Sequence, residues 1–145
     1  MAAFNKFDCF VGDLGLGVHS NLNTDTLRVY LSNIAPVAGD TVYKASGAGA
    51  GGQEDLATAY GYTAKGEDVT NTYSQTSGTA TLAIGSDIVW TASGGSIGPF
   101  RYAVLYNDTS ATDALIGWWD YGSSITVLTG ETFTFDMTAS LFTIA

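Results

Sequence analysis

The sequences IGPFRYAVLY at residues 97–106 and LIGWWDY at residues 115–121 decide the fold of this chain. Both are typical of β-strands, and both carry large apolar residues on the two faces that alternate along a strand. A strand with one face in water would alternate apolar and polar residues, so these two strands need cover on both faces. The second cover could be the chain's own N-terminal segment, a helix, a loop or another subunit.

Strict alternation assigns each large side chain of these strands to one face of the sheet. Trp118 and Trp119 are consecutive, so their side chains must point to opposite faces. One of them is therefore a core residue, and the other needs a partner or a covering segment. By this pattern Phe100, Tyr102, Val104 and Tyr106 share one face and Ala103 and Leu105 the other, while Ile116 and Trp118 oppose Leu115, Trp119 and Tyr121.

The composition indicates a single domain over residues 1–145. Hydrophobic residues make up 46% of the chain and charged residues only 13%, against about 25% charged residues in an average domain. Either Thr, Ser, Asn and Gly solvate the surface, or part of the surface is hidden in an assembly. The five basic residues are scattered and the net charge is −9, so direct binding of nucleic acid is not expected.

The single cysteine, Cys9, excludes an intrachain disulfide bond. Residues 1–10 lack the features of a secretion signal, and no apolar run approaches the ~20 residues of a membrane helix. We therefore expect synthesis in a cytoplasm and no association with a membrane.

Residues 1–25 are expected to form an N-terminal helix or arm. Apolar residues recur at spacings of three and four residues, at Phe4, Phe7, Phe10 or Val11, and Leu14, which predicts an amphipathic helix over residues 3–14. The glycines that follow would end this helix. An extended arm is the alternative, and in either case the phenylalanines would cover a sheet or contact a neighbour.

The rest of the chain shows short alternating segments at the spacing of an all-β domain, most clearly around Phe133 and Phe135. This pattern predicts an antiparallel β-sandwich or jelly roll of about eight strands. A helical turn is expected at residues 54–60. The glycine-rich loop 45–52 makes residues 45–68 the segment expected to be most mobile, apart from the extreme termini. Further strands are expected at residues 26–32, 77–84, 87–92, 124–128, 131–137 and 141–144.

The sequence offers no catalytic constellation, so we expect a protein that is not an enzyme and that holds no cofactor. His19 lies beside Ser20, but the members of a catalytic triad meet through the fold rather than as sequence neighbours. A turn or cap histidine is the better interpretation. Cys9 lies among phenylalanines, where an apolar setting raises the pKa of a thiol and makes it unreactive.

Carboxylates at four places in the chain could either bind a ligand or serve only as solvated charge. The acidic pairs at residues 54–55 and 67–68 could supply oxygen ligands for Ca²⁺, but solvated loop charge is the default and no metal site is predicted. Asp113 and Asp120 lie on either side of the two tryptophans and could serve glycoside chemistry. Nothing in the sequence fixes the separation of these two carboxylates.

Several segments together resemble a family of small virion structural proteins of tailed bacteriophages. They are WTASGGSIGPFRYAVLYND at residues 90–108, LIGWWDYGSSITV at 115–127, GETF at 130–133, FNKF at 4–7, GLGVHSNLNTDTLRVYLSN at 15–33 and GYTAKGEDVTNT at 61–72. The resemblance implies a capsid decoration or cement protein of sandwich or jelly-roll type. It brings no catalytic motif and assigns no residue roles.

A decoration role implies a location on the capsid surface, with the major capsid protein and further copies of this chain, as a dimer or trimer, as partners. A tail-tube, tail-completion or fibre-base protein is one alternative, and a carbohydrate-binding or receptor-binding module is another. The residues expected to contact a partner are aromatic: Phe4, Phe7, Phe10, Phe100, Tyr102, Trp118 and Trp119.

Overall fold

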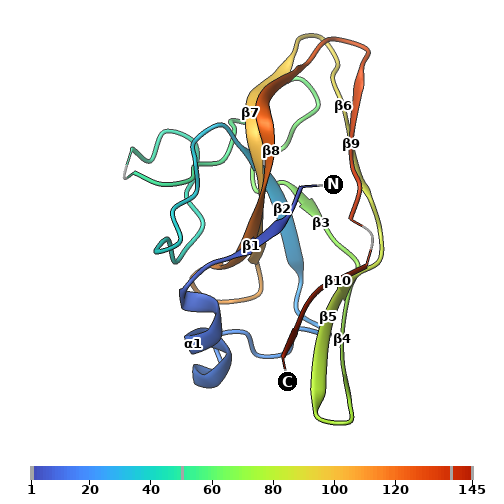
Figure 1. The fold of residues 1–145 in the computed structure, drawn as a ribbon. Coiled ribbons are helices and arrows are strands. Elements are labelled where there is room, and N and C mark those ends of the chain that lie inside the picture. Colours follow the sequence, from blue (N-terminus) through green and yellow to red (C-terminus); the bar gives the residue numbers. More distant parts are fainter. Residues whose placement is uncertain (1, 50, 138, 145) are drawn as a thin grey trace.

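The computed structural model describes residues 2–49, 51–137 and 139–144 and consists mainly of antiparallel β-sheet with one short helix (Figure 1). The prediction of an all-β fold is confirmed. The elements are β1 (Phe4–Lys6), α1 (Cys9–Leu16), β2 (Leu27–Ser32), β3 (Glu67–Asp68), β4 (Asn71–Thr76), β5 (Thr79–Ile84), β6 (Ile88–Thr91), β7 (Ile97–Asn107), β8 (Ala114–Val127), β9 (Thr132–Phe135) and β10 (Ala139–Ile144).

Two layers of sheet enclose the main core. One layer is a five-stranded sheet with the order β1-β8-β7-β2-β3, and the other consists of the ladders β6-β9 and β10-β5-β4, which follow one another along the second side (Figure 1). Val29 and Leu105 of the first layer and Leu82 and Trp90 of the second are among the buried side chains between the layers. The strand order does not confirm a jelly-roll topology.

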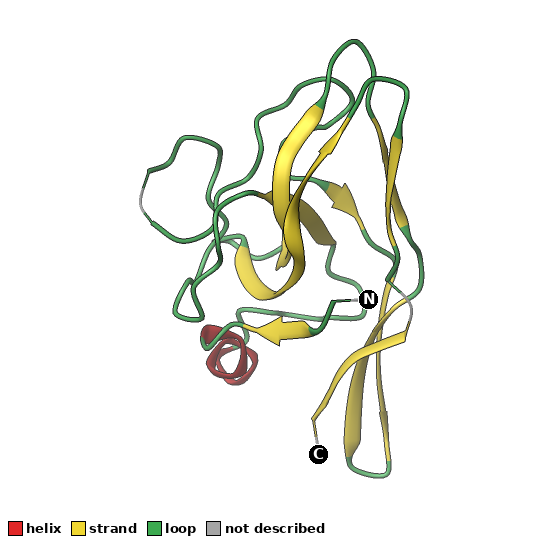
Figure 2. Cartoon of the chain, turned by 45° about the horizontal axis from the view of Figure 1, so that its top comes forward, coloured by secondary structure: helices red, strands yellow, loops and turns green. Residues whose placement is uncertain are grey.

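The second face of the five-stranded sheet is covered within the chain itself. The long connection over residues 33–66 lies on this side, away from the β6-β9 and β10-β5-β4 ladders (Figure 2), and Phe7 of the N-terminal segment packs there, whereas Phe10 of α1 packs in the main core. Tyr30 is fully buried there beside Phe7 and Tyr106, although the alternation of Leu27, Val29 and Leu31 along its strand predicts that Tyr30 points outward. The prediction that these strands need cover on both faces is confirmed, and the cover is the N-terminal segment together with a loop.

Bulges overturn part of the strict alternation in β7 and β8. The register shifts between Phe100 and Tyr102, so Phe100 lies in the main core on the side of Leu105. A second shift pairs Leu105 with Gly117 and Tyr106 with Leu115. Ile116 is therefore an extra residue in β8 without a partner in β7. An extra residue inverts the faces of all that follows.

As a consequence of the second bulge, Trp118 lies on the side of Leu115, and Trp119 lies on the side of Ile116. This reverses the predicted grouping of these four side chains. The prediction that the two tryptophans face opposite sides is confirmed.

The predicted helix over residues 3–14 is wrong in position. Phe4 lies in strand β1, opposite Trp119 of β8, and the helix spans only Cys9–Leu16. A side chain at Gly117 would collide with the Phe4 ring, because a Cβ atom built there lies 2.2 Å from Phe4 Cζ. The glycine therefore lets Phe4 lie flat on the sheet edge. The helix ends at Gly17 in the left-handed conformation, as the glycines predicted.

Other boundaries also differ from the prediction. Residues 54–60 form no helical turn, and residues 124–128 are the end of the long strand β8 rather than a separate strand. Strands β1, β3 and β4 were not predicted, so the described residues form ten strands rather than about eight. No helix in the described part of the chain has the length and apolar character to cross a membrane.

Candidate functional site

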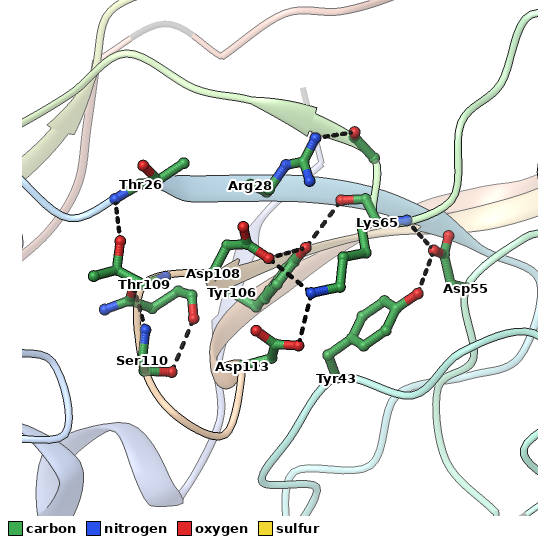
Figure 3. Close-up of polar contacts among 12 residues, drawn as sticks. Thr26, Arg28, Tyr43, Asp55, Lys65, Tyr106, Asp108, Thr109, Ser110 and Asp113 are labelled. Atoms are coloured by element: carbon green, nitrogen blue, oxygen red, sulfur yellow. Dashed lines mark hydrogen bonds and ion pairs between the residues drawn. The ribbon is translucent and has the colours of Figure 1, made fainter.

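The largest group of polar contacts lies on the covered face of the five-stranded sheet (Figure 3). Asp55 is only 3% exposed and accepts hydrogen bonds from the Tyr43 hydroxyl at 2.8 Å, from the Tyr62 hydroxyl and from the Lys65 backbone N–H at 2.5 Å. Burial raises the pKa of this carboxyl, and the hydrogen bonds act in the opposite direction. The expectation of a solvated loop charge at Asp55 is therefore wrong.

Lys65 forms the other half of this group. Its ammonium lies 3.0 Å from Asp108 Oδ1 and 3.0 Å from Asp113 Oδ2, and 5.6 Å from the centre of the Tyr43 ring. Its backbone carbonyl accepts a hydrogen bond of 3.1 Å from the Tyr106 hydroxyl. The two carboxylates raise the pKa of Lys65, so this amine stays charged and is unsuited to act as a base or nucleophile.

These contacts fasten the 33–66 connection to the sheet, and we call Tyr43, Asp55, Tyr62, Lys65, Tyr106, Asp108 and Asp113 the polar cluster. Asp120 does not join Asp113 in it, because Asp120 pairs with Arg101 at 2.7 Å while Asp113 pairs with Lys65. The described residues contain no group of carboxylates, histidines and cysteines arranged to hold a metal ion.

A second buried polar group surrounds His19, which is 5% exposed. Asn107 Nδ2 lies 3.2 Å from His19 Nδ1 and donates a 2.8 Å bond to Asp25. Asn107 Oδ1 accepts bonds from the Thr109 and Ser110 backbone N–H groups, which fixes the orientation of the amide. His19 Nδ1 is therefore the acceptor, and Nε2 carries the proton without a hydrogen-bond partner in the described structure.

This arrangement does not resemble a catalytic triad. Ser20 donates to Asp25 at 3.0 Å rather than to the imidazole. The ring of His19 packs against Phe10, with 5.1 Å between the ring centres. Burial lowers the pKa of His19. The histidine is thus an interior residue that joins the N-terminal segment to the turn after β7.

The seven aromatic residues predicted to contact a partner divide by burial. Phe7, Phe10, Phe100 and Trp119 are at most 3% exposed. Phe4, Tyr102 and Trp118 are partly exposed. Trp118 packs against Phe7, with 4.5 Å between the ring centres. Burial thus leaves only three of the seven accessible to another molecule.

An apolar groove lies between α1 and the end of β10, and we call it the α1–β10 groove. Val11, Leu14, Phe142 and Ile144 line it, and Lys6 is the one charged residue among its described lining residues. Val11 is 58% exposed, and Leu16 at the end of the same helix is 81% exposed. The sequence did not predict this surface, because the predicted helix covers residues 3–14 and therefore excludes Leu16.

A second hollow opens between the five-stranded sheet and β9. Its volume is about 200 Å³, and its walls are largely aromatic.

Comparison with known proteins does not assign a function to any of these surfaces. No protein family, curated protein or solved structure matches this chain.

Proposed function

We propose that this chain is a non-enzymatic structural protein of a tailed-bacteriophage particle, which binds the outer face of the capsid shell and reinforces it. The resemblance of its sequence segments to small virion proteins motivates the proposal. The structural observation that carries it is the α1–β10 groove, an apolar surface beside the exposed side chains of Val11 and Leu16.

The physical argument rests on how protein interfaces are stabilised. The centre of an interface is poor in charge and rich in apolar contact, because charged groups must lose their water on docking. The α1–β10 groove has this character, and Lys6 stands at its border. A net charge of −9 also favours approach to a locally basic shell surface. Many weak contacts on a symmetric lattice then add through multivalency.

The docking residues in this proposal differ from those expected from the sequence. Phe7 and Phe10 stabilise the interior and are not free to insert into a partner. Val11 and Leu16, on the exposed side of the same segment, take their place. We include self-association as a dimer or trimer in the proposal, because β10 pairs only with β5 in the described part of the chain and leaves one strand edge open. A jelly-roll topology, common in viral capsid domains, also belongs to the proposal.

The test is retention of the protein on purified particles. Val11→Asn should weaken retention on particles at every salt concentration, since it places a polar group in an apolar contact. Val89→Asn is the matched control, because Val89 is 56% exposed on strand β6, away from the groove. Equal retention of the two variants, or absence of the protein from particles, would contradict the proposal.

Copy number separates the head from the tail alternative. A decoration protein is present in many copies per particle, whereas most tail components are present in few. The carbohydrate-binding alternative predicts glycan binding that is lost on Trp118→Ala. The Trp118 ring packs against Phe7, and Trp119 is buried. Neither ring therefore presents a free face on which a sugar could stack.

A further inference from the structure

The hollow between the five-stranded sheet and β9 has the character of a small-molecule site, and we call it the aromatic cavity. Phe100, Trp119, Phe133 and Phe135 form its walls, and Leu31 and Ala103 also line it. The rings meet in pairs, with 5.0 Å between the centres of Phe100 and Phe133 and 5.0 Å between those of Trp119 and Phe135.

The aromatic cavity is a hollow that opens to the surface on one side, where the exposed residues Tyr121, Thr134 and Asp136 line it. Its volume is about 200 Å³. Apolar cavities of about 150 Å³ take up benzene. A single ring with a short substituent therefore fits between the aromatic walls.

The mouth of the cavity is polar and carries a negative charge. Tyr121, 60% exposed, lies at the mouth together with Arg101 and Asp136. Arg101 is neutralised by a bidentate pair with Asp120, with distances of 2.7 and 2.9 Å. Asp136 forms no ion pair and no side-chain hydrogen bond with any described residue.

We propose that the aromatic cavity binds a small organic cation that carries an apolar ring. The ring lies among the aromatic walls, and the ammonium group lies at the mouth, near the carboxylate of Asp136 and the ring of Tyr121. Aromatic faces attract cations, and the attraction grows as water is excluded. The net charge of −9 adds a general preference for a positive ligand. This site is independent of the proposed function, and it shares no lining residue with the α1–β10 groove.

The experiment uses three probes that share a ring and differ in charge: benzylammonium, benzyl alcohol and benzoate. Binding to the full chain at pH 7 is followed by NMR shifts of backbone amides and of the tryptophan indole N–H groups. We expect shifts at Trp119, with benzylammonium binding about threefold to tenfold more tightly than benzyl alcohol. Benzoate should bind most weakly.

Two variants separate the apolar and the charged parts of the site. Asp136→Asn should reduce the preference for benzylammonium over benzyl alcohol and leave the affinity for the alcohol unchanged. Asp8→Asn is the matched control, because Asp8 is an exposed carboxylate beside α1 whose side chain makes no capping bond. Ala103→Leu should fill the cavity and abolish the binding of all three probes.

The proposal is overturned if no probe shifts the cavity signals at millimolar concentration, or if benzyl alcohol or benzoate binds as tightly as benzylammonium. An unchanged preference for the cation in Asp136→Asn would overturn it as well. If Ala103→Leu fails to fold, the comparison of Asp136→Asn with Asp8→Asn still decides the question, because both substitutions lie on the surface and remove the same charge.

Discussion

The hydroxyl group of Tyr43 donates a 2.8 Å hydrogen bond to Oδ2 of Asp55, and so joins a loop residue to a buried carboxylate. Two further donors, the Tyr62 hydroxyl and the Lys65 backbone N–H, converge on the same carboxylate. Three segments of the 33–66 connection therefore meet at one side chain. This connection covers the second face of the sheet.

Replacement of Asp55 should destabilise the protein strongly. Asp55→Ala leaves three donors without an acceptor in an interior position, and an unsatisfied buried donor costs about 1–3 kcal/mol. We expect a loss of at least about 2 kcal/mol in the free energy of unfolding, measured by urea denaturation. Asp68→Ala is the control, because the Asp68 side chain is 70% exposed in its pair with Arg28 and such pairs contribute about 0–1 kcal/mol. Equal losses in the two variants would contradict this account.

Gly66 should tolerate no side chain. Its φ angle is +69°, and a Cβ atom there would lie 1.8 Å from the Val29 carbonyl oxygen. Gly66→Ala should therefore cost more than about 3 kcal/mol, because backbone strain and steric overlap add. Gly78 has a φ angle of +85° but open space around it, so Gly78→Ala should cost only about 1–2 kcal/mol. Thermal unfolding of both variants tests the difference, and similar melting temperatures would refute it.

The stability of the protein should fall as the pH drops below about 6.5, and His19 should account for part of the fall. Burial lowers the pKa of His19 from 6.5 and outweighs the opposing effect of Asp13 and Asp25. The unfolded chain therefore binds more protons than the folded chain between the usual pKa and the lowered one. The contribution of neutral His19 to the free energy of unfolding is complete above pH 6.5. It is lost as the pH falls from 6.5 to the pKa of His19 in the folded chain, with a slope of at most about 1.4 kcal/mol per pH unit.

The measurement for His19 is the free energy of unfolding between pH 8 and pH 5 in wild type and in His19→Gln. The difference between the two curves isolates the histidine from other titrating groups. The wild-type curve should fall more steeply below pH 6.5. Parallel curves would show that the histidine has the same pKa in the folded and unfolded chains.

Cys9 should react slowly with thiol reagents while the protein is folded. Burial raises the pKa of its thiol to about 11, and the nearby carboxylate of Asp13 acts in the same direction. At pH 8 only about 0.1% of the group is then thiolate, the reactive form. Alkylation by iodoacetamide, followed by mass spectrometry, should be more than about 100-fold slower in buffer than in concentrated urea. Comparable rates in the two solutions would contradict the buried setting.

The sequence was sufficient for the fold class because hydrophobic alternation is a local property. The segments around Trp90, Phe100 and Phe133 became strands close to their predicted bounds. The need for a second cover also followed, because apolar side chains on both faces of a strand cannot remain in water. Both inferences depend only on which residues neighbour each other in the chain.

What the sequence could not predict depends on contacts between distant residues. The bulge that leaves Ile116 unpaired is a matter of register between β7 and β8, and it decides which side Trp118 faces. The spacing of Phe4, Phe7 and Phe10 fits a helix as well as a segment that crosses a sheet edge. Asp55 looked like a loop charge because its three donors are positioned only by the fold.

The N-terminal segment connects the two cores, because Phe10 packs in the core between the layers while Phe7 packs on the opposite face of the sheet. Its binding surface on β8 is far along the chain, since Asn5 and Trp118 are 113 residues apart. On a ribosome, the phenylalanines emerge long before the strand that will bury them. Until β8 is made, neither core can close, so folding has to await nearly the whole chain, and the exposed aromatic segment is open to chaperones or to another nascent copy.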